Sequence, residues 1–162
     1  MRKHLVRASA TLAIALGAVS ACGGSPATSS ASPTSTCINA SAPHHAYVVV
    51  QHLSGTSMQK CVGFSTETID GPTLMDMSGI GYQTQTFSFG KAVCQLDNEP
   101  AQFSQCFPQG QPTWTLFVET AGAWAVAATG YTQVTVHDKE ALGWRFELYD
   151  PSPAAPPLAK ES

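Results

Sequence analysis

Residues 46–50 read Ala-Tyr-Val-Val-Val, a continuous apolar run rich in β-branched side chains. Such a run is typical of a strand that is buried on both faces. One short helix is predicted over residues 71–79. Asp70 can cap its start, Pro72 suits its first turn, and Gly79 can end it. Further strand-like segments are found at 61–64, 82–89, 92–96, 114–118, 123–127, 134–136 and 144–148. This order predicts an α+β fold, a single small β-rich domain with one short helix.

The two ends of the chain differ in composition from its middle. Residues 1–21 combine a basic start with a short apolar run, the pattern of a signal peptide too short to span a membrane as an ordinary helix. Residues 22–36 are rich in Ser, Thr, Pro and Gly, which predicts a flexible linker. Residues 151–162 are rich in Pro, which predicts a disordered tail. The folded domain is therefore expected at 37–150, a length usual for one domain.

The signal pattern ends in Val19-Ser20-Ala21-Cys22-Gly23, which resembles the lipobox of bacterial lipoproteins. In that family the cysteine is alkylated with diacylglycerol and becomes the first residue after cleavage. The resemblance implies that Cys22 is lipidated, that the lipid bilayer is a partner, and that the domain lies on the extracytoplasmic face of the cell membrane. The alternative is an ordinary secretory signal cut after Ala21, which leaves Cys22 as an unpaired thiol.

The five cysteines fit this location. Lipidation of Cys22 leaves four cysteines, an even number, and we expect these four to form disulfides outside the cytoplasm. The short loop between Cys94 and Cys106 favours a disulfide there, worth about 3 kcal/mol in the chain-entropy model. That pairing leaves Cys37 for Cys61. The partner of Cys37 nevertheless stays open, because this residue lies beside the linker.

Charge and motifs argue against several classes of function. Without residues 1–21 the chain has five Lys and Arg residues and eleven Asp and Glu residues, so its surface is expected to be acidic. An acidic surface argues against a nucleic-acid partner. The sequence contains no Gly-x-Ser-x-Gly, no His-Glu-x-x-His, no Gly-rich phosphate loop and no Cys-x-x-Cys. We therefore expect a protein that is not an enzyme and has no cofactor.

Two groups of polar side chains are possible sites. His44, His45 and His52 are possible metal ligands, but neighbouring residues of a strand point to opposite faces, so these side chains would not easily share one ion. We interpret them as a polar lead-in to the first strand. Asp97 and Glu99 precede Pro100 in a solvated turn, which lacks the cleft that acid–base catalysis needs. The sequence thus predicts no metal site and no catalytic residue.

Several landmarks of the domain occur together in one order over residues 47–146. They are Val48-Val49-Val50, the helix at 71–79, Val93-Cys94-Gln95-Leu96-Asp97, Cys106, the strand at 114–118, Gly122-Ala123-Trp124, Gly130 and Gly143-Trp144-Arg145-Phe146. In this order they resemble the transcobalamin-like C-terminal domain family of secreted bacterial proteins. The resemblance implies a β-grasp-like fold, a Cys94–Cys106 disulfide and a binding role without established catalytic residues. The resemblance does not imply a corrinoid-binding site, because in the vertebrate vitamin B12 carriers that give the family its name a large additional helical domain supplies much of that site.

Aromatic side chains are the best candidates for a ligand site in this sequence. Trp124, Trp114 and Tyr131 are the ligand-binding candidates, and Trp124 lies beside a predicted hairpin turn, where its ring could be exposed. The competing interpretation is that these rings fill the core of a small domain. The sequence therefore predicts a membrane-anchored, non-catalytic binding module for an unknown small molecule, linked to uptake. The alternative is a structural or protein-interaction accessory of the cell envelope with no small-molecule site.

Overall fold

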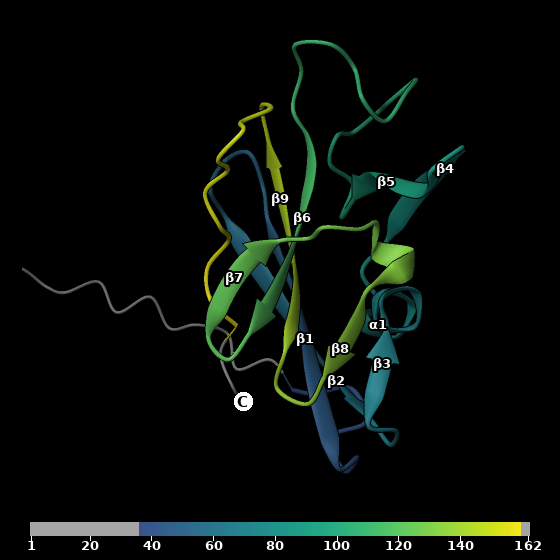
Figure 1. Cartoon of the computed structure of the whole chain (residues 1–162), viewed down its shortest axis with the longest axis vertical. Coiled ribbons are helices and arrows are strands. Elements are labelled where there is room, and N and C mark those ends of the chain that lie inside the picture. Colours follow the sequence, from purple (N-terminus) through teal and green to yellow (C-terminus); the bar gives the residue numbers. More distant parts are fainter. Residues whose placement is uncertain (1–35, 160–162) are drawn as a thin grey trace, which may run out of the picture. The chain divides into compact units, whose positions relative to one another are not determined.

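Strand β1 (His44–Gln51) lies inside a mixed five-stranded sheet in the computed structural model of the chain, which describes residues 36–159. The sheet has the order β2-β1-β9-β6-β7, with the other strands at Ser57–Phe64 (β2), Ala141–Glu147 (β9), Thr113–Thr120 (β6) and Ala123–Val126 (β7). The pairing of β1 with β9 is parallel, and all other neighbours in this sheet are antiparallel. Figure 1 shows these strands as one twisted layer.

The expectation for β1 is confirmed, because its central residues are buried on both faces of the sheet. Val48 and Val50 belong to the larger core cluster, whereas Tyr47 belongs to a second, smaller cluster on the opposite face. We call the first side the inner face and the second the outer face. Strand β9 follows the same alternation, with Trp144 on the inner face and Ala141 on the outer one.

Helix α1 (Gly71–Ser78) packs on the inner face. It begins as predicted, because the Asp70 carboxylate accepts a hydrogen bond of 2.9 Å from the Thr73 backbone N–H. It ends at Gly79, whose φ of 71° is left-handed. Its deepest side chains are Leu74 and Met75, and the Trp144 indole N–H contacts the Met75 sulfur at 3.3 Å.

Two short sheets accompany the main one. Strand β3 (Thr68–Asp70) pairs with β8 (Thr135–His137), and β4 (Tyr82–Phe87) pairs with β5 (Gly90–Leu96). A single 3-10 turn covers Tyr131–Gln133 in the described part of the chain. Strand β3 was not predicted, since three residues are too short for a period-two pattern to be recognised. Together these elements give a mostly β domain with one short α-helix among the described residues, which confirms the α+β class.

The disulfide favoured by the sequence is present, and so is a second one that gives Cys37 the partner that the sequence leaves open. Cys94 is joined to Cys106, and Cys37 to Cys61. The segment around Cys37 is fixed to the sheet, because the Ile38 N–H donates to the Cys61 carbonyl at 2.9 Å and the Ile38 carbonyl accepts from Gly63 at 2.7 Å. A Cβ on Gly63 would lie 2.1 Å from the Asn39 carbonyl oxygen, so this close approach requires glycine.

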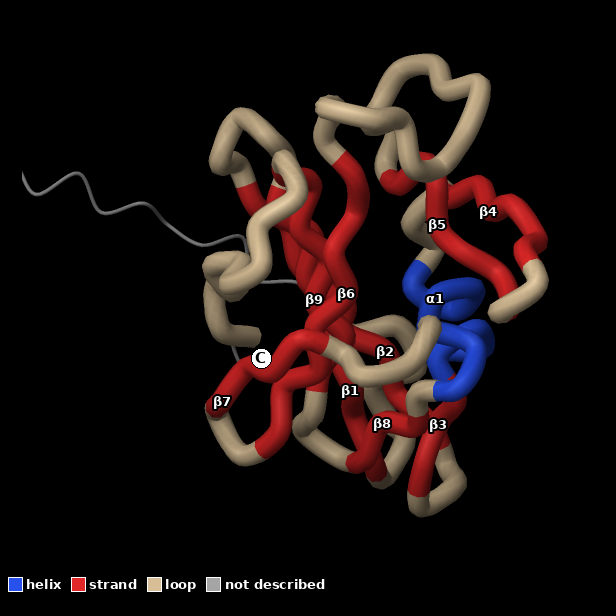
Figure 2. Tube along the Cα trace, turned by 45° about the horizontal axis from the view of Figure 1, so that its top comes forward, coloured by secondary structure: helices blue, strands red, loops and turns tan. Residues whose placement is uncertain are grey.

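The C-terminal segment differs from the expectation of a disordered tail. Residues 151–159 turn back from the end of β9 and run along the sheet toward β7 (Figures 1 and 2). Pro156 is buried, and Ala159 packs with the outer-face cluster. A proline-rich composition disfavours helix and sheet, but it does not prevent a segment from packing as an irregular strap.

The expected signal peptide, Cys22 and the linker up to residue 35 lie outside the described residues. Within residues 36–159 no helix is both long and apolar enough to cross a membrane.

Candidate functional site

The β4–β5 hairpin carries exposed aromatic side chains at its end. Phe87 pairs with Gly90, which leaves Ser88 and Phe89 as a two-residue turn. Gly90 has a φ of 122°, which an L side chain rarely adopts, and this lets the chain reverse tightly. The rings of Phe87 and Phe89 are nearly parallel, at 6°, with centroids 5.1 Å apart.

The loop after β5 brings a third ring to the same place. Cys106 is bonded to Cys94 of β5, and the next residue, Phe107, lies with its ring centroid 5.5 Å from Phe87 and 6.4 Å from Phe89. We call Phe87, Phe89 and Phe107 the phenylalanine platform. The hairpin that carries it lies beside α1 and away from β7 (Figures 1 and 2).

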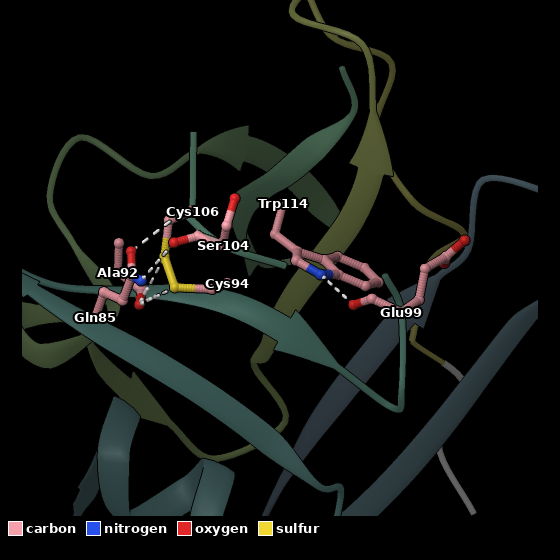
Figure 3. The surroundings of a disulfide bond; sticks show 7 residues. All are labelled: Gln85, Ala92, Cys94, Glu99, Ser104, Cys106 and Trp114. Carbon is pink, nitrogen blue, oxygen red and sulfur yellow. Dashed lines mark hydrogen bonds between the residues drawn. A yellow bond between two sulfur atoms is a disulfide. The ribbon is translucent and has the colours of Figure 1, made fainter. Parts of the chain in front are cut away.

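Glutamine side chains hold this loop in place. The Gln85 side-chain oxygen accepts from the Cys106 N–H at 3.1 Å, and its amide nitrogen lies 3.5 Å from the Ser104 carbonyl (Figure 3). The largely buried Gln95 donates to the Pro100 carbonyl at 2.7 Å and accepts from Gln83 at 2.5 Å. The loop that carries Phe107 is therefore fixed by a disulfide and by hydrogen bonds of glutamine side chains, of which Gln95 is buried.

Two rings of the platform are exposed, and the chain segments that carry them contain few charged residues. Phe89 is 65% exposed and Phe107 is 50% exposed. Lys91 is the only charged side chain in residues 80–96 and 100–118, although the whole chain has eleven acidic residues. Exposed aromatic rings in a charge-poor region are typical of binding surfaces.

The aromatic ligand face predicted from the sequence is not formed, because two of its three members are core residues. Trp114 is 7% exposed and donates its indole N–H to the Glu99 carbonyl at 2.9 Å (Figure 3), and its ring packs on Phe146. Tyr131 is 4% exposed and meets Trp144 edge-on at 6.1 Å. Trp124 is half-buried and packs with the cluster on the outer face, so the three rings share no surface.

Tyr82 and Tyr131 are poor candidates for acid–base chemistry. Burial raises the pKa of Tyr82 and of Tyr131. The Tyr82 hydroxyl donates to the Asp76 carboxylate at 2.6 Å, which raises the Tyr82 pKa further. Both groups therefore stay neutral at physiological pH and act as packed, hydrogen-bonded rings.

The structure joins His52 to the turn after β5, a pairing that the sequence did not reveal. Its Nδ1 lies 2.7 Å from a Glu99 carboxylate oxygen, and its Nε2 lies 3.2 Å from an Asp97 oxygen. A neutral imidazole has only one N–H, so only the protonated ring can donate to both carboxylates. The two contacts use opposite nitrogens, so the three groups do not converge on one point.

Metal ligation finds no further support in the described residues. In that part of the chain, no group of three or more His, Cys, Asp and Glu side chains is placed to hold a metal ion. His45 contacts the Ala40 carbonyl at 3.2 Å, and His44 lies 4.0 Å from Asp138. These histidines and His52 thus have separate partners.

Two hollows lie away from the platform. One, of about 530 Å³, borders the start of α1 and includes Asp70, Thr73 and Met77. The other, of about 500 Å³, borders the β6–β7 turn and includes Glu119 and Glu140. Neither is lined by the predicted ligand residues Trp114, Trp124 and Tyr131.

Comparisons with known proteins bear on the fold alone. No family model matches the chain, and no curated protein matches it. Among solved structures it is similar to a "putative metal binding protein" from Ruminococcus gnavus, with a TM-score of 0.50 and 16% identity. The similarity covers 66% of this chain and 99% of that chain. It agrees with a small β-rich α+β domain.

Proposed function

We propose that the protein is a non-catalytic interaction module that docks on an envelope protein through the phenylalanine platform. In this proposal the acylated Cys22 holds the module at the extracytoplasmic face of the cell membrane. The observation that carries it is the contact of three phenylalanine rings, two of them exposed, where the β4–β5 hairpin meets a loop that is held by a disulfide.

The shape of the platform favours a macromolecular partner over a small molecule. Phe89 occupies the turn of a hairpin whose other end, at Leu96, packs in the core, and its ring is 65% exposed. Small molecules bind in concave sites that cover most of their surface. A projecting aromatic group instead fits a recess on a partner and acts as an anchor there. Of the two functions expected from the sequence, the protein-interaction accessory is therefore favoured.

The surroundings of the platform have the composition of a protein interface. Gln102, Gln105 and Gln109 are exposed in the loop that carries Phe107. Interfaces typically combine an apolar centre, depleted of charge, with a polar rim that hydrogen-bonds to the partner. The fixed loop reduces the entropy lost on binding, which favours affinity.

Location outside the cytoplasm is supported by the cysteines. Both disulfides join parts of the described domain, and disulfides persist mainly in oxidising compartments. With Cys37 and Cys61 paired, Cys94 and Cys106 paired, and Cys22 in the lipobox-like stretch, every cysteine of the chain has a role in this proposal.

A β-grasp-like fold and membership of the transcobalamin-like C-terminal domain family remain part of the proposal. The parallel pairing of β1 with the last strand, β9, supports a β-grasp-like arrangement. So does helix α1, which follows the β1–β2 hairpin and packs across the inner face.

Site-specific crosslinking in cells tests the docking proposal. A photo-reactive amino acid is placed at Phe107, which is 50% exposed, or at Val126, which is also 50% exposed and lies on β7. We expect Phe107 to crosslink to one envelope protein and Val126 not to do so. The double substitution Phe87→Ser and Phe89→Ser, made with the reactive group at Phe107, should reduce that crosslink at least tenfold.

Three outcomes would count against docking on a protein. They are equal crosslinking from both positions, crosslinking from Phe107 to lipid alone, and a protein crosslink unchanged by the double substitution. The melting temperature of each variant shows whether the domain is still folded.

A further inference from the structure

The outer face of the main sheet is covered by the chain's own proline-rich segment. Residues 151–159 leave the end of β9, turn back and reach β7 (Figures 1 and 2). Within this segment Pro156 is buried, whereas its neighbour Pro157 is exposed. One proline is therefore selectively seated on the sheet.

Pro156 packs against Gly143 and Trp124, and we call this position the proline seat. A Cβ on Gly143 would lie 2.7 Å from Pro156 Cγ, 2.7 Å from Trp124 Cζ3 and 2.8 Å from Trp124 Cη2. Glycine at this point of β9 lets both rings approach the backbone of the sheet. The indole ring and the strand thus enclose the proline ring from two sides.

An arginine binds the backbone of the same segment. The Arg145 guanidinium donates to the Ala154 carbonyl at 2.9 Å and lies 3.4 Å from the Ala155 carbonyl. Its Nε lies 3.0 Å from a Glu147 carboxylate oxygen, which orients the guanidinium. These contacts recognise main-chain carbonyls just before the seated proline and do not depend on the alanine side chains.

One donor at the seat is unused. The Trp124 indole nitrogen is buried and has no hydrogen-bond partner. Buried N–H groups normally have one. An unpaired donor beside a seated proline is therefore a place where another segment, slightly differently arranged, could add a hydrogen bond.

We infer that the outer face, at Trp124, Gly143 and Arg145, is a recognition site for proline-rich peptide segments. Proline has no N–H, so such segments present carbonyls and ring surfaces, which aromatic rings and donors bind in known recognition modes. The site is occupied in cis by the chain's own residues 151–157 and opens to an equivalent proline-rich segment of a partner protein when that strap leaves. This site lies on different strands from the phenylalanine platform and does not depend on it.

Binding of a labelled peptide to the full chain tests the inference. The probe is a fluorescent peptide with the sequence of residues 150–159, and the readout is its anisotropy. A tethered strap has an effective concentration on the order of mM, so it should compete strongly with the free peptide. The substitution Pro156→Asp places a carboxylate in the buried seat and should unseat the strap. We therefore expect this variant to bind the peptide at least tenfold more tightly than the wild-type chain.

Matched variants separate recognition from general disturbance. Pro157→Asp makes the same chemical change at an exposed position and should leave the peptide affinity at the wild-type value. Adding Gly143→Ala to Pro156→Asp should abolish the gain, because the new Cβ fills the seat. Pro156→Gly gives a milder release of the strap if the aspartate variant fails to fold, as judged by circular dichroism.

The inference is overturned if a folded Pro156 variant binds the peptide no better than the wild-type chain at peptide concentrations up to about 1 mM, the range of the tethered strap. It is also overturned if Gly143→Ala leaves the gain intact.

Discussion

At the scale of single residues, the packing of the outer face depends on the absence of a side chain at Gly143. Its neighbours Leu142 and Trp144 are buried on the inner face, whereas the rings of Trp124 and Pro156 on the outer face leave no room for even a methyl group at this position. The sequence could not show this, because a glycine within a strand pattern has the same appearance whether it marks a bulge, a bend or a close approach.

Gly143→Ala should destabilise the domain by about 1–3 kcal/mol, as overpacking typically does. Urea unfolding followed by tryptophan fluorescence measures the change. Gly81→Ala is the control, since a Cβ there meets no atom within 4 Å and its φ lies outside the left-handed region. The control should change stability by less than about 0.5 kcal/mol. Equal effects of the two substitutions would contradict the close approach at Gly143.

Residue patterns anticipated the core better than the surface. The apolar run around Val48 correctly predicted buried positions, since a continuous apolar run is typical of a strand that is buried on both faces. The exposed role of Phe89 and Phe107 was missed, because a phenylalanine in a strand or loop is usually a core residue. The pairing of His52 with Glu99 spans 47 positions, and no local pattern reports such a contact.

At the scale of elements, α1 is specified locally at its start. The Thr73 backbone N–H and hydroxyl both donate to the Asp70 carboxylate, at 2.9 and 2.8 Å. Asp70→Ala should therefore cost about 1 kcal/mol of unfolding free energy, the usual value for a lost N-cap. Chemical denaturation near pH 7 measures this, with Glu67→Ala as an exposed control of the same charge change. A loss no larger than that of the control would contradict the capping role.

The same cap predicts a dependence of stability on pH. The hydrogen bond from the Thr73 backbone N–H, with that from its hydroxyl, lowers the Asp70 pKa from its ordinary value of 3.8. A carboxyl group with a lowered pKa in the folded state stabilises above its unfolded pKa and loses that contribution as the pH falls through the folded value. The wild type should therefore have a higher free energy of unfolding than Asp70→Asn near pH 7, and this difference should decrease as the pH falls below about 4. The reason is that Asn can cap the helix but does not titrate. A difference that stays constant down to pH 2 would contradict this assignment.

The Cys94–Cys106 disulfide controls the loop element that carries part of the platform. Replacing both cysteines by serine should cost about 2–4 kcal/mol. The Cys37–Cys61 bridge spans 24 positions against 12, so its removal should cost about 0.6 kcal/mol more in the loop-entropy model. Denaturant midpoints compare the two variants.

Only loss of the Cys94–Cys106 disulfide should weaken crosslinking from Phe107, since the other disulfide lies at β2. Equal weakening by loss of either disulfide would show that the platform is not held by its own loop.

At the scale of the whole molecule, local rules gave the class of fold but not the arrangement of its layers. Strand runs, one capped helix and glycine turns predicted an α+β domain, and the structure has that composition. The parallel pairing of β1 with β9 joins segments nearly 100 residues apart, and such pairing is set by packing rather than by local sequence. The strap was missed for the same reason, because its seat is created by two distant strands.

The anchoring of the molecule at the membrane can be tested directly. Cells expressing the full chain are grown with an alkyne-bearing fatty acid, and the purified protein is reacted with a fluorescent azide. We expect the wild-type chain to be labelled and to fractionate with membranes, whereas Cys22→Ser should be unlabelled. Cys37→Ser is the control for loss of a cysteine and should still be labelled, because that residue belongs to a disulfide. An unlabelled, soluble wild-type chain would remove the membrane from the proposal, while leaving the crosslinking and peptide experiments able to support or reject the two binding surfaces.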